Sequence, residues 1–150
     1  MLEHPFEHHL AWRIFPGMIR PMSVHKLLEI DLVTVVIPCF NPDPAHLAEA
    51  VRSALASTVR PHELLLIDDG TSRPESLSAL KAWAQHPGVR VITHPENRGL
   101  SAARNTGMQA AETDLVLQLD ADDRIDPTFL EKATWALACR PEWSFVNAWV

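Results

Sequence analysis

The chain has 150 residues, of which 47% are hydrophobic and 21% are charged. This composition is typical of one globular domain and excludes a disordered or fibrous protein. Nineteen acidic and thirteen basic residues give a net charge of −6, which argues against nucleic-acid binding because such proteins usually present a basic face.

From residue 32 onward, aliphatic runs alternate with segments whose apolar residues have helical spacing. The expected elements, in chain order, are a strand at 32–38, a helix at 44–58, a strand at 63–69, a helix at 74–85, a strand at 89–94, a helix at 100–111, a strand at 114–119, a helix at 126–140 and the start of a strand at 144–150. Asp126 is the expected cap of the last helix, with Pro127 in its first turn. Continuous apolar strands that alternate with helices predict an α/β fold with a doubly wound, mostly parallel sheet and helices on both faces.

Residues 1–31 are rich in His, Pro and Met and show no clear period, so we expect an N-terminal extension ahead of a domain at 32–150. The segment HPFEH at 4–8 matches the H-x-x-E-H zinc-protease signature. However, Pro5 falls where that signature needs a helix, so we favour a solvated N-terminus. The strand pattern stops at Val150, so we expect a truncated form of this fold.

The apolar runs are too short to span a bilayer, and we expect neither a membrane span nor a signal peptide. Cys39 and Cys139 have no metal-ligand spacing, which favours a reduced, cytoplasmic setting.

Polar residues collect at the carboxyl ends of the predicted strands, where ligands bind in folds of this class. The strand at 114–119 runs into Asp120, Asp122 and Asp123, which repel one another. One interpretation is a solvated acidic loop. A second is an EF-hand loop, but Ile125 stands where that loop needs glycine. A third is a hard divalent cation held by one or two carboxylates and open to phosphate oxygens.

The strand at 63–69 ends in Asp68 and Asp69, and Gly70 allows the chain to turn. Either Asp68 caps amides of a simple turn, or one of the two carboxylates accepts a base N–H or a ribose hydroxyl. Phe40, at the end of the neighbouring strand, is either a core residue or a flat face for that base.

The segment NRGLSAARNTG, residues 97–107, places cations and a glycine before a helix start. Amides at a helix N-terminus, with Arg98 or Arg104, suit an anionic diphosphate. Arg104 is equally suited to a structural pair with the neighbouring carboxylates, and the small residues of this helix favour close packing on the sheet.

Taken together, VTVVIPCFNP, ELLLIDDGTS, HPENRGLSAARNTG and LVLQLDADD resemble, in order and approximate spacing, the motifs of family 2 glycosyltransferases of the GT-A fold, which is Rossmann-like. The resemblance covers residues 33–150. It implies a nucleotide-sugar donor, usually a UDP-sugar, a Mn²⁺ or Mg²⁺ ion, and inversion at the anomeric carbon.

Carried over by position, the resemblance assigns the nucleotide pocket to Pro38, Phe40, Asn41, Asp68, Asp69, Arg98, Arg104 and Asp120. Asp69 is the carboxylate expected to meet uracil. The D-x-D motif assigns the metal to Asp120 and Asp122, with Asp123 able to take the place of either. Phe40 stands where many members carry tyrosine, which keeps the stacking face and removes a hydroxyl.

The family's general base is a later Asp or Glu, and we assign no residue of this chain to that role. After Asp126 the acids are Glu131 and Glu142, both in or just after a predicted surface helix. We therefore expect residues 1–150 to be a donor-binding half that binds UDP and metal without transferring sugar. The acceptor is an unspecified glycan, lipid or protein. We expect a cytoplasmic location, which extends to peripheral association with the inner face of the membrane.

Two rival functions remain at this point. A receiver-type signalling domain also has an acidic pair after an aliphatic strand, but it begins with that strand and needs a late Lys, and no Lys follows Lys132. The other rival is a non-catalytic nucleotide-binding module.

Overall fold

The computed structural model describes residues 11–13, 33–140 and 142–147. Its elements are β1 (Ala11–Arg13), β2 (Val33–Cys39), α1 (Pro44–Leu55), β3 (Glu63–Asp68), α2 (Pro74–Trp83), β4 (Val89–Thr93), α3 (Leu100–Ala110), β5 (Leu115–Gln118) and α4 (Phe129–Cys139). The predicted alternation of strands and helices is confirmed from β2 to α4, and the boundaries differ from the expected ones by a few residues.

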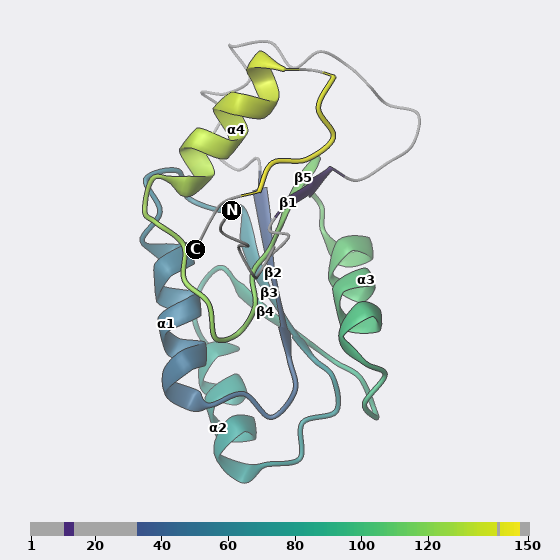
Figure 1. Cartoon of the computed structure of the whole chain (residues 1–150). Coiled ribbons are helices and arrows are strands. Elements are labelled where there is room, and N and C mark those ends of the chain that lie inside the picture. Colours follow the sequence, from purple (N-terminus) through teal and green to yellow (C-terminus); the bar gives the residue numbers. More distant parts are fainter. Residues whose placement is uncertain (1–10, 14–32, 141, 148–150) are drawn as a thin grey trace, which may run out of the picture.

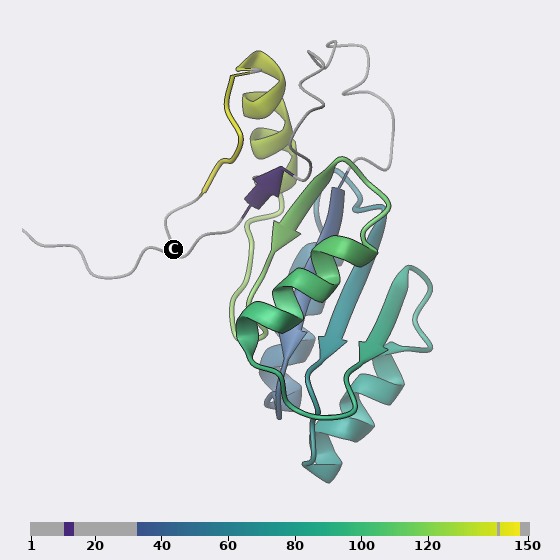
Figure 2. The same cartoon turned by 90° about the vertical axis from the view of Figure 1, so that its right-hand side faces the viewer.

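The five strands form one sheet in the order β1-β5-β2-β3-β4. Strand β2 pairs in parallel with both β3 and β5, and β3 pairs in parallel with β4. Helices α1 and α2 lie on one side of this sheet and α3 lies on the other (Figures 1 and 2). The predicted doubly wound, mostly parallel α/β fold is therefore confirmed.

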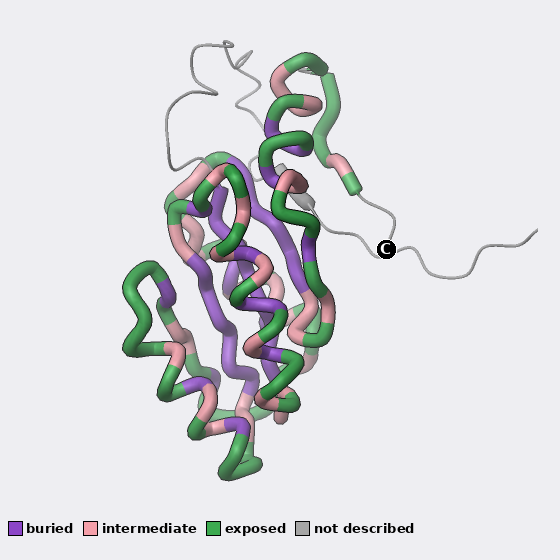
Figure 3. Tube along the Cα trace, turned by 90° about the vertical axis from the view of Figure 1, so that its left-hand side faces the viewer, coloured by how far each residue is buried: buried purple, intermediate pink, exposed green. Residues whose placement is uncertain are grey.

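Both faces of the sheet are buried, which explains why the strands read as continuous apolar runs. In β2, Val35 and Ile37 belong to the core cluster beneath α1 and α2, whereas Val36 belongs to the cluster beneath α3. In β3, Leu64 and Leu65 divide in the same way. Figure 3 shows the buried strands between helices that are exposed on their outer sides.

Helix α3 packs closely on the sheet because it presents small residues to it. A Cβ atom built on Gly107 would lie 2.2 Å from the Cγ1 atom of Val36, so this position admits no side chain without movement of helix or strand. The close packing expected from the small residues of this helix is confirmed.

The structure corrects three expectations at the chain ends. Strand β1 lies within the segment that we assigned to the extension, where it pairs antiparallel with β5. It was missed because three residues are too few to show a period. The strand expected at 144–150 is wrong for residues 144–147, which form no strand, while 148–150 lie outside the described residues. The HPFEH segment also lies outside them.

The third correction concerns the start of α4. Thr128, not Asp126, occupies the N-cap position, and the helix begins at Phe129. The Asp126 carboxylate accepts a hydrogen bond from the Thr128 amide at 2.9 Å, so it closes a turn that precedes the helix. No helix in the described part of the chain is long and apolar enough to cross a membrane.

Candidate functional site

The carboxyl ends of β2 and β5 lie side by side, although α1 leaves β2 on one face of the sheet and α3 leads to β5 on the other. This topological switch point is where open α/β sheets bind their ligands. An open cavity of about 320 Å³ lies there. We call it the acidic lobe, and its lining residues are Pro38, Phe40, Pro42, Asp43, His46, Leu100, Asp120, Ala121 and Asp122.

A second cavity of about 360 Å³ adjoins the first, and we call it the Asp69 lobe. It is lined by Pro38, Cys39, Phe40, Asp69, Asn97, Gly99, Leu100 and Ala103. The two lobes share Pro38, Phe40 and Leu100. Phe40 is 55% exposed, so it is a wall of the site and not a core residue.

The Asp69 carboxylate is buried and receives three hydrogen bonds from the segment 94–99. His94 Nδ1 lies 2.6 Å from Oδ1, the Arg98 amide donates to Oδ1 at 3.0 Å, and the Gly99 amide donates to Oδ2 at 2.8 Å. Burial by itself raises the pKa of Asp69, but the bonds from His94, Arg98 and Gly99 together hold that pKa below its ordinary value. Asp69 is therefore an ionised anchor for this segment.

Sequence reasoning missed His94, which is buried at the end of β4. Its Nε2 atom lies 2.9 Å from Thr106 Oγ1 on α3. The available signal was a histidine that directly follows a predicted strand at the ligand-binding edge, one strand away from the acidic pair.

Asp68 and Asn41 hold the loop that follows β3. Asp68 Oδ1 accepts a hydrogen bond from the Thr71 amide at 2.9 Å, as the turn-cap alternative for this residue predicted. Asn41, with a φ of 48°, accepts bonds at Oδ1 from the Ser72 and Arg73 amides, each at 2.9 Å. Neither Asp68 nor Asn41 lines the two lobes. They affect the site indirectly, by holding the loop that follows β3.

Gly70 lets this loop approach the segment 94–99. Its φ is +74°, and a Cβ atom there would lie 2.5 Å from the Asn97 amide nitrogen. Only glycine combines this backbone conformation with so close a contact. Gly70 thereby allows the loops after β3 and β4 to lie in contact next to Asp69.

Arg104 of α3 pairs with the first carboxylate of the D-x-D motif. Its Nη2 atom donates to Asp120 Oδ1 at 2.7 Å, as the structural alternative for this arginine predicted. The buried Nε atom of Arg104 has no hydrogen-bond partner among the described residues, so a water or ligand oxygen is needed to satisfy it. The Arg98 side chain, by contrast, is exposed.

Asp122 is exposed and lines the acidic lobe beside Asp120. Asp123 is partly buried, and its amide bonds to the Asp120 carbonyl at 3.1 Å. Within the described residues no three His, Cys, Asp or Glu side chains converge into a ready metal cluster. The motif thus presents two carboxylates to an open cavity and no complete cage.

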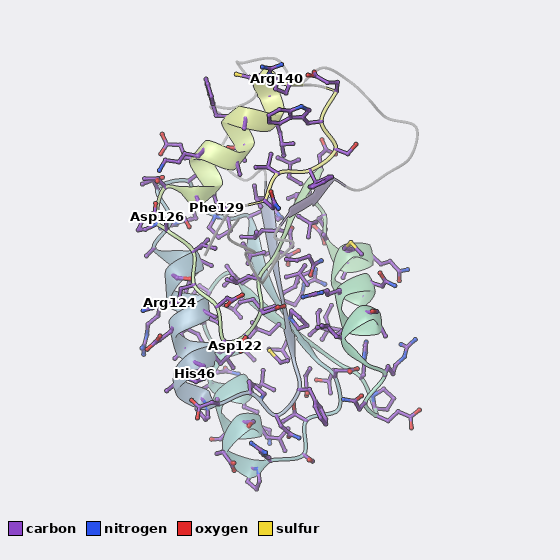
Figure 4. The ribbon with its side chains drawn as sticks, viewed as in Figure 1. His46, Asp122, Arg124, Asp126, Phe129 and Arg140 are labelled. Atoms are coloured by element: carbon purple, nitrogen blue, oxygen red, sulfur yellow. The ribbon has the colours of Figure 1, made fainter. Side chains whose placement is uncertain are left out.

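The sequence did not point to Asp43 and His46, which also line the acidic lobe. Asp43 caps α1 through Oδ1, which accepts from the Ala45 amide at 2.8 Å and the His46 amide at 3.2 Å. Figure 4 shows His46 on α1 close to Asp122 in the loop after β5. The two lobes thus share Phe40 as a wall but present different polar groups to a ligand.

The sequence model of glycosyl transferase family 2 matches residues 34–138, most of the described core. This chain belongs to that family. It is 33% identical over 105 residues to an uncharacterized glycosyltransferase, EpsJ, of Bacillus subtilis, covering 70% of this chain and 30% of that protein. It is 43% identical over 102 residues to an undecaprenyl-phosphate 4-deoxy-4-formamido-L-arabinose transferase of Pseudomonas paraeruginosa, covering 65% and 30%.

A solved structure with a similar fold is S. aureus TarS, residues 1–349, in complex with UDP-GlcNAc. Its TM-score is 0.62 at 23% identity, and the match covers 71% of this chain and 31% of that one. The family member described here thus has the predicted GT-A fold, and it spans about a third of the length of these relatives.

Proposed function

We propose that this chain is the donor-binding part of a glycosyltransferase that transfers a sugar from a UDP-sugar, with a divalent cation and inversion at the anomeric carbon. The observation that carries the proposal is the pair of lobes that share Phe40 as a wall. The Asp69 lobe offers an anchored carboxylate and a flat aromatic wall, which suit a pyrimidine base. The acidic lobe offers carboxylates, which suit a cation bound to a diphosphate.

The residues of the acidic lobe fit a resident Mn²⁺ or Mg²⁺. Such ions use one or two carboxylates and take their remaining ligands from water and substrate phosphates, so two open carboxylates without a closed cage are the expected set. Asp120 and Asp122 would hold the ion, with Asp123 as an alternative ligand. When bound, the ion would offset the negative charge of the leaving diphosphate.

Arg104 and the apolar residues shared by the two lobes would contact different parts of the nucleotide. Arg104 holds Asp120 in place and carries an unsatisfied Nε–H, which suits a region that receives a diphosphate. Pro38, Phe40 and Leu100 form the apolar divide on which the nucleotide would rest.

No general base is assigned among the described residues. Glu131 Oε2 accepts a hydrogen bond from Thr58 Oγ1 at 2.8 Å, and Glu142 pairs with Arg140 at 3.7 Å. Neither acid lines the two lobes, and α4 lies at the opposite end of the sheet from the site (Figure 1). The acceptor, whether glycan, lipid or protein, the cytoplasmic location and any association with the inner face of a membrane remain parts of the proposal.

The test is calorimetric titration of the chain with UDP, GDP and ADP, each with Mn²⁺ and with EDTA. We expect UDP to bind more tightly than ADP, because a carboxylate accepts the N3–H of uracil and repels the bare ring nitrogen of adenine. We also expect UDP to bind more tightly with Mn²⁺ than with EDTA, because without metal the diphosphate would face uncompensated carboxylates. Asp69→Ala should reduce the difference between UDP and ADP. Equal affinity for UDP and ADP, or equal affinity for UDP with EDTA and with Mn²⁺, would refute the proposal. Metal-dependent UDP binding without any turnover of UDP-sugars, even in a longer natural chain, would favour the non-catalytic module.

A further inference from the structure

His94 is a buried histidine whose two ring nitrogens both have side-chain partners, one in the loop after β3 and one on α3. Nδ1 lies 2.6 Å from Asp69 Oδ1 and Nε2 lies 2.9 Å from Thr106 Oγ1. The imidazole therefore bridges the end of β3, which carries Asp69, and the middle of α3.

The direction of these hydrogen bonds follows from the chemistry of the partners. The lowered pKa of Asp69 keeps its carboxylate ionised, and an ionised carboxylate only accepts hydrogen bonds. Nδ1 must therefore carry a proton. A neutral His94 is then the Nδ1–H tautomer, and its bare Nε2 accepts from the Thr106 hydroxyl.

The Asp69 carboxylate has about four acceptor positions. His94, the Arg98 amide and the Gly99 amide occupy three of them. Asp69 also lines the Asp69 lobe, so the one acceptor position that remains is the one through which a ligand in that lobe can bind. The three donors thus fix which part of the carboxylate a ligand meets.

The bridge also joins the two lobes. Thr106 follows Arg104 by two residues on α3, and Arg104 holds Asp120 in the acidic lobe. The carboxylates of the two lobes are thereby tied to the same helix, one through His94 and the other through Arg104.

We propose that His94 is a positioning residue for base recognition: through Nδ1–H it holds Asp69 so that one acceptor position faces the ring N–H of a pyrimidine. This inference rests on the proposed UDP-sugar function. His94 itself contacts no ligand and acts only through Asp69, with Thr106 as the second support of the imidazole.

The experiment compares UDP with N3-methyl-UDP, which lacks the ring N–H, by calorimetry with Mn²⁺. Wild-type chain should prefer UDP by about tenfold or more, the size expected for one hydrogen bond to a charged group. In His94→Ala this preference should fall below about threefold. His94→Asn, whose amide nitrogen can replace the Nδ1 donor, should restore most of it, and Thr106→Val should lower it partly.

Two controls separate positioning from a loss of structure. Pyrophosphate with Mn²⁺, which needs only the acidic lobe, should bind wild type and all variants equally. In ¹⁵N spectra, the His94 ring should show a protonated Nδ1 in wild type. If His94→Ala does not fold, His94→Asn and Thr106→Val carry the comparison.

A folded His94→Ala that keeps the wild-type preference for UDP would overturn the inference, as would His94→Asn performing no better than His94→Ala. UDP and N3-methyl-UDP binding equally to wild type would overturn this inference alone. Absence of UDP binding to wild type would overturn the proposed function and this inference together.

Discussion

The two acidic loops at the carboxyl edge of the sheet differ in how their charges are accommodated. In the loop after β3, Asp69 is 2% exposed and accepts three hydrogen bonds from its own chain. In the loop after β5, Asp122 is exposed and has no hydrogen-bond or ion-pair partner among the described residues. Asp120, between these extremes, is partly exposed and is held by Arg104.

The two aspartates thus differ in what satisfies their charge before a ligand binds. Asp69 is satisfied by the protein before any ligand arrives, so it contributes to folding as well as to the site. Asp122 is satisfied by solvent, so its charge is available to a cation at little cost to the fold. The same residue type at the end of two buried strands therefore predicts opposite responses to substitution.

The largest expected effect is on stability. Asp69→Ala leaves the His94 ring and two amides without their acceptor, and we expect a loss of about 3 kcal/mol in the free energy of unfolding. Asp122→Ala is the matched control and should change stability by less than about 0.5 kcal/mol. Urea denaturation of the three proteins measures both values. Similar losses in the two variants would remove the distinction between the loops.

The second prediction concerns stability at low pH. The change in stability should not exceed that of the first prediction, because both arise from the hydrogen bonds that Asp69 accepts. The pKa of Asp69 is lower in the folded chain than in the unfolded one. Its stabilising effect is therefore complete above the unfolded pKa, about 3.9, and is lost as the pH falls through the folded pKa. Asp69→Asn should be less stable than wild type at neutral pH and should lose less stability below about pH 4.

Thermal unfolding between about pH 2.5 and 6 tests this. Asp43 and Asp126 also have lowered pKa values, held by the His46 and Ala45 amides in the first case and by Thr128 in the second. Both carboxylates remain in the variant, so their contributions cancel and the difference between the two curves reports Asp69 together with the hydrogen bonds that it accepts. Parallel curves would contradict the prediction.

The smallest effect is on ligand binding through the exposed loop. Asp122→Asn should weaken UDP binding in the presence of Mn²⁺ by more than about tenfold, or about 1.4 kcal/mol, because one charged metal ligand is lost. With EDTA the variant and wild type should bind UDP equally weakly. Titrations in both buffers supply the comparison, and an unchanged affinity with Mn²⁺ would show that Asp122 holds no metal.

Much of the fold was predictable because burial on both faces leaves a strong local signal. The run at 32–38 and the residues around Leu65 read as strands since every position packs against a helix layer. The elements that failed carry little local signal. Strand β1 is three residues long and exists through its pairing with β5, and the residues at 144–147 have strand propensity without a strand partner in the described structure.

The candidate site, like the fold, was predictable only in part. The sequence by itself determined which residues reach the carboxyl edge, because a strand end followed by Asp68 and Asp69, or by Asp120 and Asp122, is a local pattern. The tertiary structure alone decided which of these carboxylates is anchored and which is open. His94 is 25 residues from Asp69 and Arg104 is 16 residues from Asp120, and both pairs form only when the crossovers bring strand ends and α3 together. Hydrogen bonds and burial depend on that approach in space, which no local pattern of residues records.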